Sequence, residues 1–131
     1  MTLLPVTLAA AAAAAILNIW LSIRIGAVRQ AAEISIGDGG NEALERRMRA
    51  QANFIENTPL LLILVAVIEL SGKGSWWLAY VAGVYMIARI AHAYGMDGGS
   101  FQIGRMIGSL VTMLFSLGLA IVAALIGAGV M

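Results

Sequence analysis

Three polar residues share one face of a segment that leads into an apolar stretch. Arg49, Asn53 and Glu56 are spaced i, i+4 and i+7, so a helix would align them along one side. The segment 60–68 that follows holds no charged residue. A charged side chain in an apolar layer is costly and normally faces a protein interior or a wet cavity. The spacing therefore predicts a site where the guanidinium holds anions and the carboxylate pairs with an arginine or an ammonium group.

More cations are expected at the same level of the molecule. Arg29, and with it Arg24, belongs to the segment before this one, whereas the later segments bring Arg89 with His92, and Arg105. Guanidinium groups that outnumber the nearby acids indicate an anion site. A ligand that carries both carboxylates and an amine would fit the combination.

The composition indicates the elements that must position these residues. Hydrophobic residues make up 61% of the 131 and charged residues 11%, against about half and a quarter in soluble proteins. With a mean hydropathy of +0.93, the chain is expected to be an all-α integral membrane protein. The net charge of +1 predicts no nucleic-acid partner. Because there is no cysteine, no thiolate metal site is expected, and any thiol chemistry must come from a bound ligand.

Four helices are expected in a single domain, 1–131, as an up-down-up-down bundle. They cover about 2–29, 41–70, 75–95 and 101–130, separated by glycine-rich turns. A cleaved signal peptide is the alternative for the uncharged segment 1–23, but the segment lacks a basic start and is longer than a signal's apolar region. Gly104 and Gly108, four apart, predict close helix packing.

The charge distribution predicts the orientation in the membrane. All seven arginines fall near the end of the bundle that carries the first and third loops, and Lys73 is alone at the other end. Basic residues favour the cytoplasmic side. We therefore expect loops 30–41 and 96–101 in the cytoplasm and both termini outside.

Simpler interpretations remain open for several of these residues. Arg24, Arg46 and Arg47, and also Arg29, could be positive-inside residues that face water or lipid headgroups. Arg89 and Glu56 could form a structural ion pair between helices, with nothing bound, and His92 could be an ordinary interior histidine. Glu69 and Lys73, four apart, are expected to pair at the far interface.

The order of these residues resembles the MAPEG family, membrane-associated proteins in eicosanoid and glutathione metabolism. The resemblance rests first on the helical pattern that begins at Glu45 and runs through Arg49, Asn53 and Glu56 to Pro59. Gly26 with Arg29, Arg89 with His92, and Arg105 follow in matching order, and the loop 36–41 is similar to that of uncharacterised bacterial members. The resemblance covers essentially the whole chain.

This resemblance implies a homotrimer, in a bacterial inner membrane, that binds glutathione between neighbouring subunits and takes a lipophilic molecule from the bilayer. The expected glutathione ligands are Arg29, Arg49, Asn53, Glu56, Arg89 and His92. Arg105 would stabilise the glutathione thiolate, as the catalytic residue of a transferase or peroxidase that acts on lipophilic electrophiles or hydroperoxides.

Two other functions remain open. The chain departs from eicosanoid-metabolising members at Ala52, Met96 and Met106, where they often carry arginine, tyrosine and serine. These departures favour a non-catalytic, lipid-binding or scaffold member of the family. A small proton-coupled efflux protein, with Glu56 as its membrane carboxylate, is the third hypothesis, but it leaves the cluster of arginines unexplained.

Overall fold

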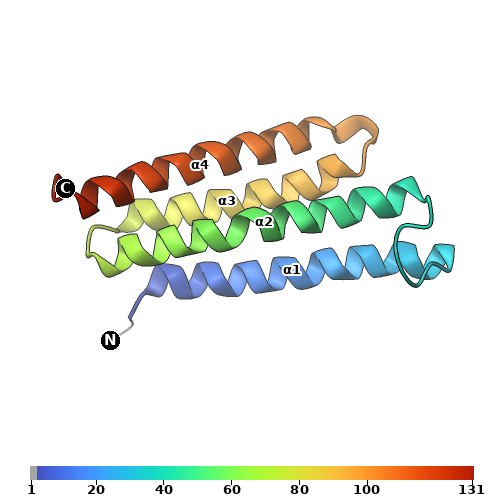
Figure 1. Cartoon of the computed structure of the whole chain (residues 1–131), viewed down its shortest axis with the longest axis horizontal. Helices are drawn as coiled ribbons and strands as arrows, with labels where there is room; N and C mark the ends of the chain where they lie inside the picture. Colours follow the sequence, from blue (N-terminus) through green and yellow to red (C-terminus); the bar gives the residue numbers. More distant parts are fainter. Residues whose placement is uncertain (1–2) are drawn as a thin grey trace.

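The protein is a bundle of four antiparallel helices. The computed structural model describes residues 3–131, which form α1 (Pro5–Ala32), α2 (Glu42–Leu70), α3 (Trp76–Met96) and α4 (Ile103–Gly127). A short 3-10 turn, η1 (Gly99–Phe101), precedes α4. Figure 1 shows the start of α1 and the end of α4 at one end of the bundle, with the α1–α2 and α3–α4 loops at the other. The all-α, up-down-up-down fold is confirmed, although α1 continues three residues beyond its expected end at 29.

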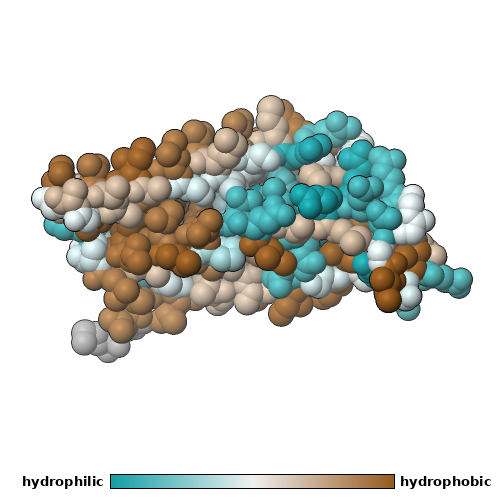
Figure 2. Space-filling model, in the orientation of Figure 1, coloured by the Kyte–Doolittle hydropathy of each residue, from teal (hydrophilic) through white to brown (hydrophobic). Residues whose placement is uncertain are grey.

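The surface of the bundle is that of a membrane protein. Among the described residues, α1, α2 and α4 are each long and apolar enough to cross a membrane. α3, which contains Arg89 and His92, is not among these three, yet it runs alongside the other helices of the bundle (Figure 1). In Figure 2 apolar residues cover the end where α1 begins, and hydrophilic residues gather toward the end with the first and third loops.

Glycines bring α3 and α4 into close contact at this polar end, as the spacing of Gly104 and Gly108 predicted. A Cβ on Gly108 would lie 2.3 Å from the Cβ of His92, and one on Gly104 would lie 2.4 Å from a carbonyl oxygen of α3. On α3 itself, a Cβ on Gly95 would lie 2.0 Å from the backbone nitrogen of Arg105. The absence of side chains here lets α4 approach His92 and fixes where Arg105 leaves the bundle.

Two helix starts are stabilised by side-chain oxygens, one from the adjacent loop and one from another helix. Asn41 caps α2, and its Oδ1 accepts a hydrogen bond of 3.0 Å from the backbone nitrogen of Leu44. The expected pair of Glu69 with Lys73 is wrong, since no such ion pair exists within residues 3–131. Instead the Glu69 carboxylate accepts hydrogen bonds of 2.8 Å from the backbone nitrogens of Val6 and Thr7. It thereby satisfies free N–H groups at the start of α1 and ties α1 to α2.

Substitution of Gly108 tests the helix contact. In Gly108→Ala the new methyl group must displace His92 or the α3 backbone, so we expect a loss of about 1–3 kcal/mol in unfolding free energy. The control is Gly118→Ala on the same helix, where a Cβ meets nothing within 4 Å. Thermal unfolding in detergent micelles, followed by circular dichroism, measures both variants. Equal stability of the two would contradict the close packing.

Candidate functional site

A buried arginine joins three helices near the polar end of the bundle. Arg89 on α3 is only 3% exposed, so its charge must be satisfied internally. Its Nη1 donates to Oγ1 of Thr112 on α4 at 2.9 Å, and its Nη2 donates to Oδ1 of Asn53 on α2 at 2.7 Å. His92 Nδ1 lies 3.5 Å from Nη2, and the Phe54 ring lies 6.0 Å from the guanidinium carbon. Asn53, Arg89 and His92 are therefore brought together.

The partners of Arg89 are neutral groups. The suggested structural ion pair between Arg89 and Glu56 does not form, since Glu56 pairs with Arg49 instead. Among the described residues, Nε of Arg89 is the one buried side-chain nitrogen or oxygen atom without a hydrogen-bond partner. His92 is 2% exposed, so it occupies the interior position that the simpler interpretation gave it. The cation is held by dipoles, with no carboxylate beside it.

Arg49 and Glu56 stand on the outer side of α2. Their side chains are 57% and 58% exposed, and the closest nitrogen and oxygen are 3.9 Å apart. Such a long, exposed ion pair contributes little to stability. On the flank of a helix that crosses a membrane, however, exposed charges need a protein, ligand or water contact. The pair therefore marks a surface that the single chain leaves uncovered.

Within residues 3–131, Arg29 and Arg105 make no hydrogen bond or ion pair with Arg49 or Glu56. Arg29 is bound to the first loop, where its Nη1 donates to the carbonyl oxygen of Gly37 at 2.7 Å. It also lines a groove of about 410 Å³ between α1 and α2, together with Gln51 and Ala52. Arg105 is exposed in the first turn of α4 and makes no side-chain hydrogen bond or ion pair within residues 3–131. One chain thus gathers Asn53, Arg89 and His92, whereas the other predicted ligands make no side-chain hydrogen bond or ion pair with these three in the described part of the chain, and the binding of all of them to glutathione stays a prediction.

Three interior hydroxyl residues were not predicted as polar contacts from the sequence. Thr112 accepts from Arg89, and the hydroxyl groups of Tyr85 and Thr58 are 2.8 Å apart in the core. Tyr85 is four residues before Arg89, and that spacing alone could have placed both on one helical face. Nothing in the apolar sequence around Thr112 singles it out. Within residues 3–131 there is also no cluster of His, Asp or Glu that could hold a metal ion.

A second cluster of charged residues joins three helices at the loop end of the bundle. Arg24 on α1 is buried and forms an ion pair with Asp97, just after α3. Its guanidinium carbon lies 5.1 Å from the ring centroid of Trp20 and 5.0 Å from that of Tyr94. Arg47 on α2 reaches the same carboxylate at 3.7 Å. The expectation that Arg24 and Arg47 face water or headgroups is therefore wrong, because both serve to join three helices.

Removal of the acid in this cluster should be costly. Asp97→Ala leaves the buried Arg24 without its counter-ion, so we expect a loss of about 2 kcal/mol or more in unfolding free energy. Glu42→Ala, which breaks the exposed pair with Arg46 on the same loop end, should cost only about 0.5 kcal/mol. Thermal unfolding of both variants makes the comparison. Similar losses would show that Arg24 finds another partner.

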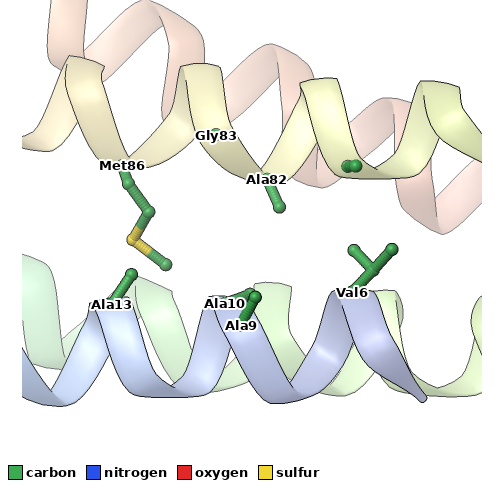
Figure 3. A pocket seen from close by; sticks show the side chains of 8 residues that line it. Val6, Ala9, Ala10, Ala13, Ala82, Gly83 and Met86 are labelled. Carbon is green, nitrogen blue, oxygen red and sulfur yellow. The ribbon is translucent and has the colours of Figure 1, made fainter. Parts of the chain in front are cut away.

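An apolar groove lies in the half of the bundle away from the arginines. It has a volume of about 250 Å³, and α1 and α3 line it with small residues such as Ala10, Ala13, Ala82 and Gly83. The Met86 side chain extends across it toward Ala13 (Figure 3). No charged side chain lines it. It is suited to contact with lipid tails and offers no groups for chemistry.

Comparisons with known proteins give one family model and two similar relatives. The family model described as "MAPEG family" matches residues 7–125. The chain is also similar to a protein named "Inner membrane protein YecN" from Escherichia coli strain K12, with 28% identity over 89 residues that cover 67% of each chain. The protein of the same name from Escherichia coli O6:H1 strain CFT073 matches to the same extent.

Proposed function

This chain belongs to the MAPEG family, and from that premise we propose that it is a glutathione-dependent membrane enzyme, a transferase or peroxidase. Glutathione carries two carboxylates, one ammonium group and a thiol. The main observation in its favour is that three charged side chains are exposed on helices whose other exposed residues are mostly apolar. They are Arg49, Glu56 and Arg105. Two guanidinium groups and one carboxylate complement the carboxylates and the ammonium of that ligand.

The same exposed charges support an assembly with the ligand between subunits, and the family resemblance implies that this assembly is a homotrimer. Arg49 and Glu56 on α2 and Arg105 on α4 cannot face hydrocarbon without a large cost. A neighbouring subunit would cover them, and a charged ligand in the interface would neutralise them. Arg29, in its groove between α1 and α2, is available to the same interface. In this arrangement the site is complete only in the assembly.

Arg105 is the proposed catalytic residue. An ordinary thiol has a pKa of about 8.5 and is a weak nucleophile at neutral pH. Because Arg105 has no partner within residues 3–131, its guanidinium is free to stabilise a thiolate, and in a partly dry site it could lower the pKa of the thiol by about two. The bound thiolate would supply the nucleophile that attacks a lipophilic electrophile or hydroperoxide arriving from the bilayer. The protein needs no cysteine of its own for this chemistry.

We also propose an orientation for the protein in the membrane. Both helix-joining loops at the arginine-rich end, 30–41 and 96–101, would lie in the cytoplasm, where glutathione is present, with both termini outside. The name of the relative YecN supports an inner membrane as the site. Membrane lipid and a lipophilic molecule are the other proposed partners.

A non-catalytic, lipid-binding member of the family is the second candidate. The observation in its favour concerns the position of Met96, where eicosanoid-metabolising members place a tyrosine. The nearby Tyr94 cannot replace that hydroxyl group, because its ring packs at 5.5 Å against Trp20 and lies over Arg24 on the α1 side. Glutathione binding without turnover of any electrophile or hydroperoxide would favour this candidate.

Thiolate formation tests the role of Arg105. We expect unsubstituted protein to convert bound glutathione to thiolate at neutral pH, and Arg105→Ala to reduce that fraction by about tenfold or more, since the cation that stabilises sulfur is lost. Ultraviolet absorbance of the thiolate measures the effect. Lys73→Ala, at the opposite end of the bundle, is the control and should leave the absorbance unchanged. An undiminished signal in Arg105→Ala would remove Arg105 from the proposed mechanism.

Glu56 is expected to bind the ammonium group. Glu56→Gln removes the negative charge but keeps the shape, so the dissociation constant of glutathione should rise about tenfold. Glu45→Gln, an exposed acid in the first turn of the same helix, is the matched control and should bind normally. Isothermal titration gives both constants. Equal affinity in the two variants would show that Glu56 does not contact the ligand.

A further inference from the structure

The amide of Asn53 can face Arg89 in only one way. Nη2 of Arg89 lies 2.7 Å from Oδ1 of Asn53. A guanidinium group has hydrogen-bond donors and no acceptor, so the amide oxygen must point inward and the amide nitrogen outward. Nδ2 of Asn53 makes no hydrogen bond within residues 3–131. It also reaches the surface, because Arg89 Nε is the one buried side-chain polar atom left without a partner there.

Thr112 fixes the guanidinium from the other side. Its Oγ1 donates to the carbonyl oxygen of Gly108 at 2.8 Å and accepts from Nη1 of Arg89 at 2.9 Å. Because the hydroxyl proton is committed to Gly108, Thr112 can only accept from Arg89. The guanidinium is therefore held in a fixed plane, with its second amino group aimed at Asn53. Both Thr112 and Arg89 are buried, so neither reaches a ligand at the surface.

We propose that Arg89 and Thr112 are positioning residues that make Asn53 a pure donor, so that the ligand places a carboxylate, and not its ammonium group, at Nδ2. The positive charge behind the amide strengthens this preference by polarising its N–H bonds. Glu56, three residues further along the same helical face, then takes the ammonium. The α-amino-acid end of glutathione binds in one orientation only. The inference rests on the proposed function and concerns how the same site recognises its ligand.

Titration with three ligands distinguishes this single orientation from binding without a preferred orientation. They are glutathione, its analogue without the α-carboxylate of the γ-glutamyl residue, and its analogue without the amino group of that residue. For the unsubstituted protein we expect loss of the carboxylate to weaken binding at least about tenfold. Isothermal titration with the trimeric protein in detergent gives the three dissociation constants and hence the ratios between them.

One variant changes Asn53 itself, and the others change Thr112, which holds Arg89 in place beside it. Thr112→Val keeps the shape but removes the acceptor for Arg89, so the penalty for the missing carboxylate should shrink to about threefold, whereas Thr112→Ser should restore it. Asn53→Asp pairs with Arg89 and removes the donor, so it should bind glutathione poorly but bind the analogue without the carboxylate as well as the unsubstituted protein does. In every Thr112 variant the penalty for the missing amino group should stay the same, because it depends on Glu56.

The outcomes distinguish this inference from the function on which it rests. If the unsubstituted protein binds no ligand, the proposed function fails and the inference fails with it. If it binds glutathione but Thr112→Val leaves the carboxylate penalty unchanged, the inference alone is overturned. A merely structural role of Thr112 would weaken all three ligands equally, and that result would overturn it as well.

A measurement without ligand checks the hydrogen bonds themselves. With ¹⁵N-labelled asparagine, Thr112→Val should shift the side-chain amide resonance of Asn53, and Thr112→Ser should leave it close to its original position. Asn18, whose amide oxygen accepts from Gln51 on the far side of α2, is the internal control and should not move. An unmoved Asn53 resonance in Thr112→Val would overturn the positioning role.

Discussion

The packing of the polar half of the bundle depends on the need to stabilise the buried guanidinium group of Arg89. A cation inside an apolar bundle is stable only if dipoles or an anion surround it. Here Asn53 on α2 and Thr112 on α4 supply the dipoles. The same contacts that stabilise the charge also set the rotation of three helices relative to one another. They consequently decide which residues of α2 face inward and which, like Glu56, face out.

Close helix contact makes that arrangement possible. Thr112 reaches Arg89 because Gly104 and Gly108 let α4 approach the α3 backbone. At the loop end, Arg24 and Asp97 join α1 to α3, and at the other end Glu69 holds the start of α1. Apart from Nε of Arg89, the buried side-chain polar atoms of residues 3–131 therefore find their partners within the single chain. The chain also leaves exposed charges on its flanks, and this is the surface where we propose that a ligand and a second subunit bind.

Much of the fold could be predicted from the sequence, because membrane helices have a strong signal. Apolar length predicted the four helices, and the Gly104–Gly108 spacing predicted the close approach of α3 and α4. The candidate functional site was harder to predict than the fold. The i, i+4, i+7 spacing placed Arg49, Asn53 and Glu56 on one face, but that face is broad, and Asn53 turns into the bundle while its neighbours stay exposed. Partner choice depends on tertiary packing, which explains why the roles of Arg24 and Glu69 were missed.

The central claim is that the exposed charges of α2 and α4 form a glutathione site in the assembled protein. Its most direct test is isothermal titration of glutathione into the folded, detergent-solubilised protein at low salt, with the oligomeric state measured on the same sample. The account predicts saturable binding by a homotrimer. A folded trimer that gives no binding heat at millimolar glutathione, and shows no protection against thermal unfolding by it, would contradict the claim.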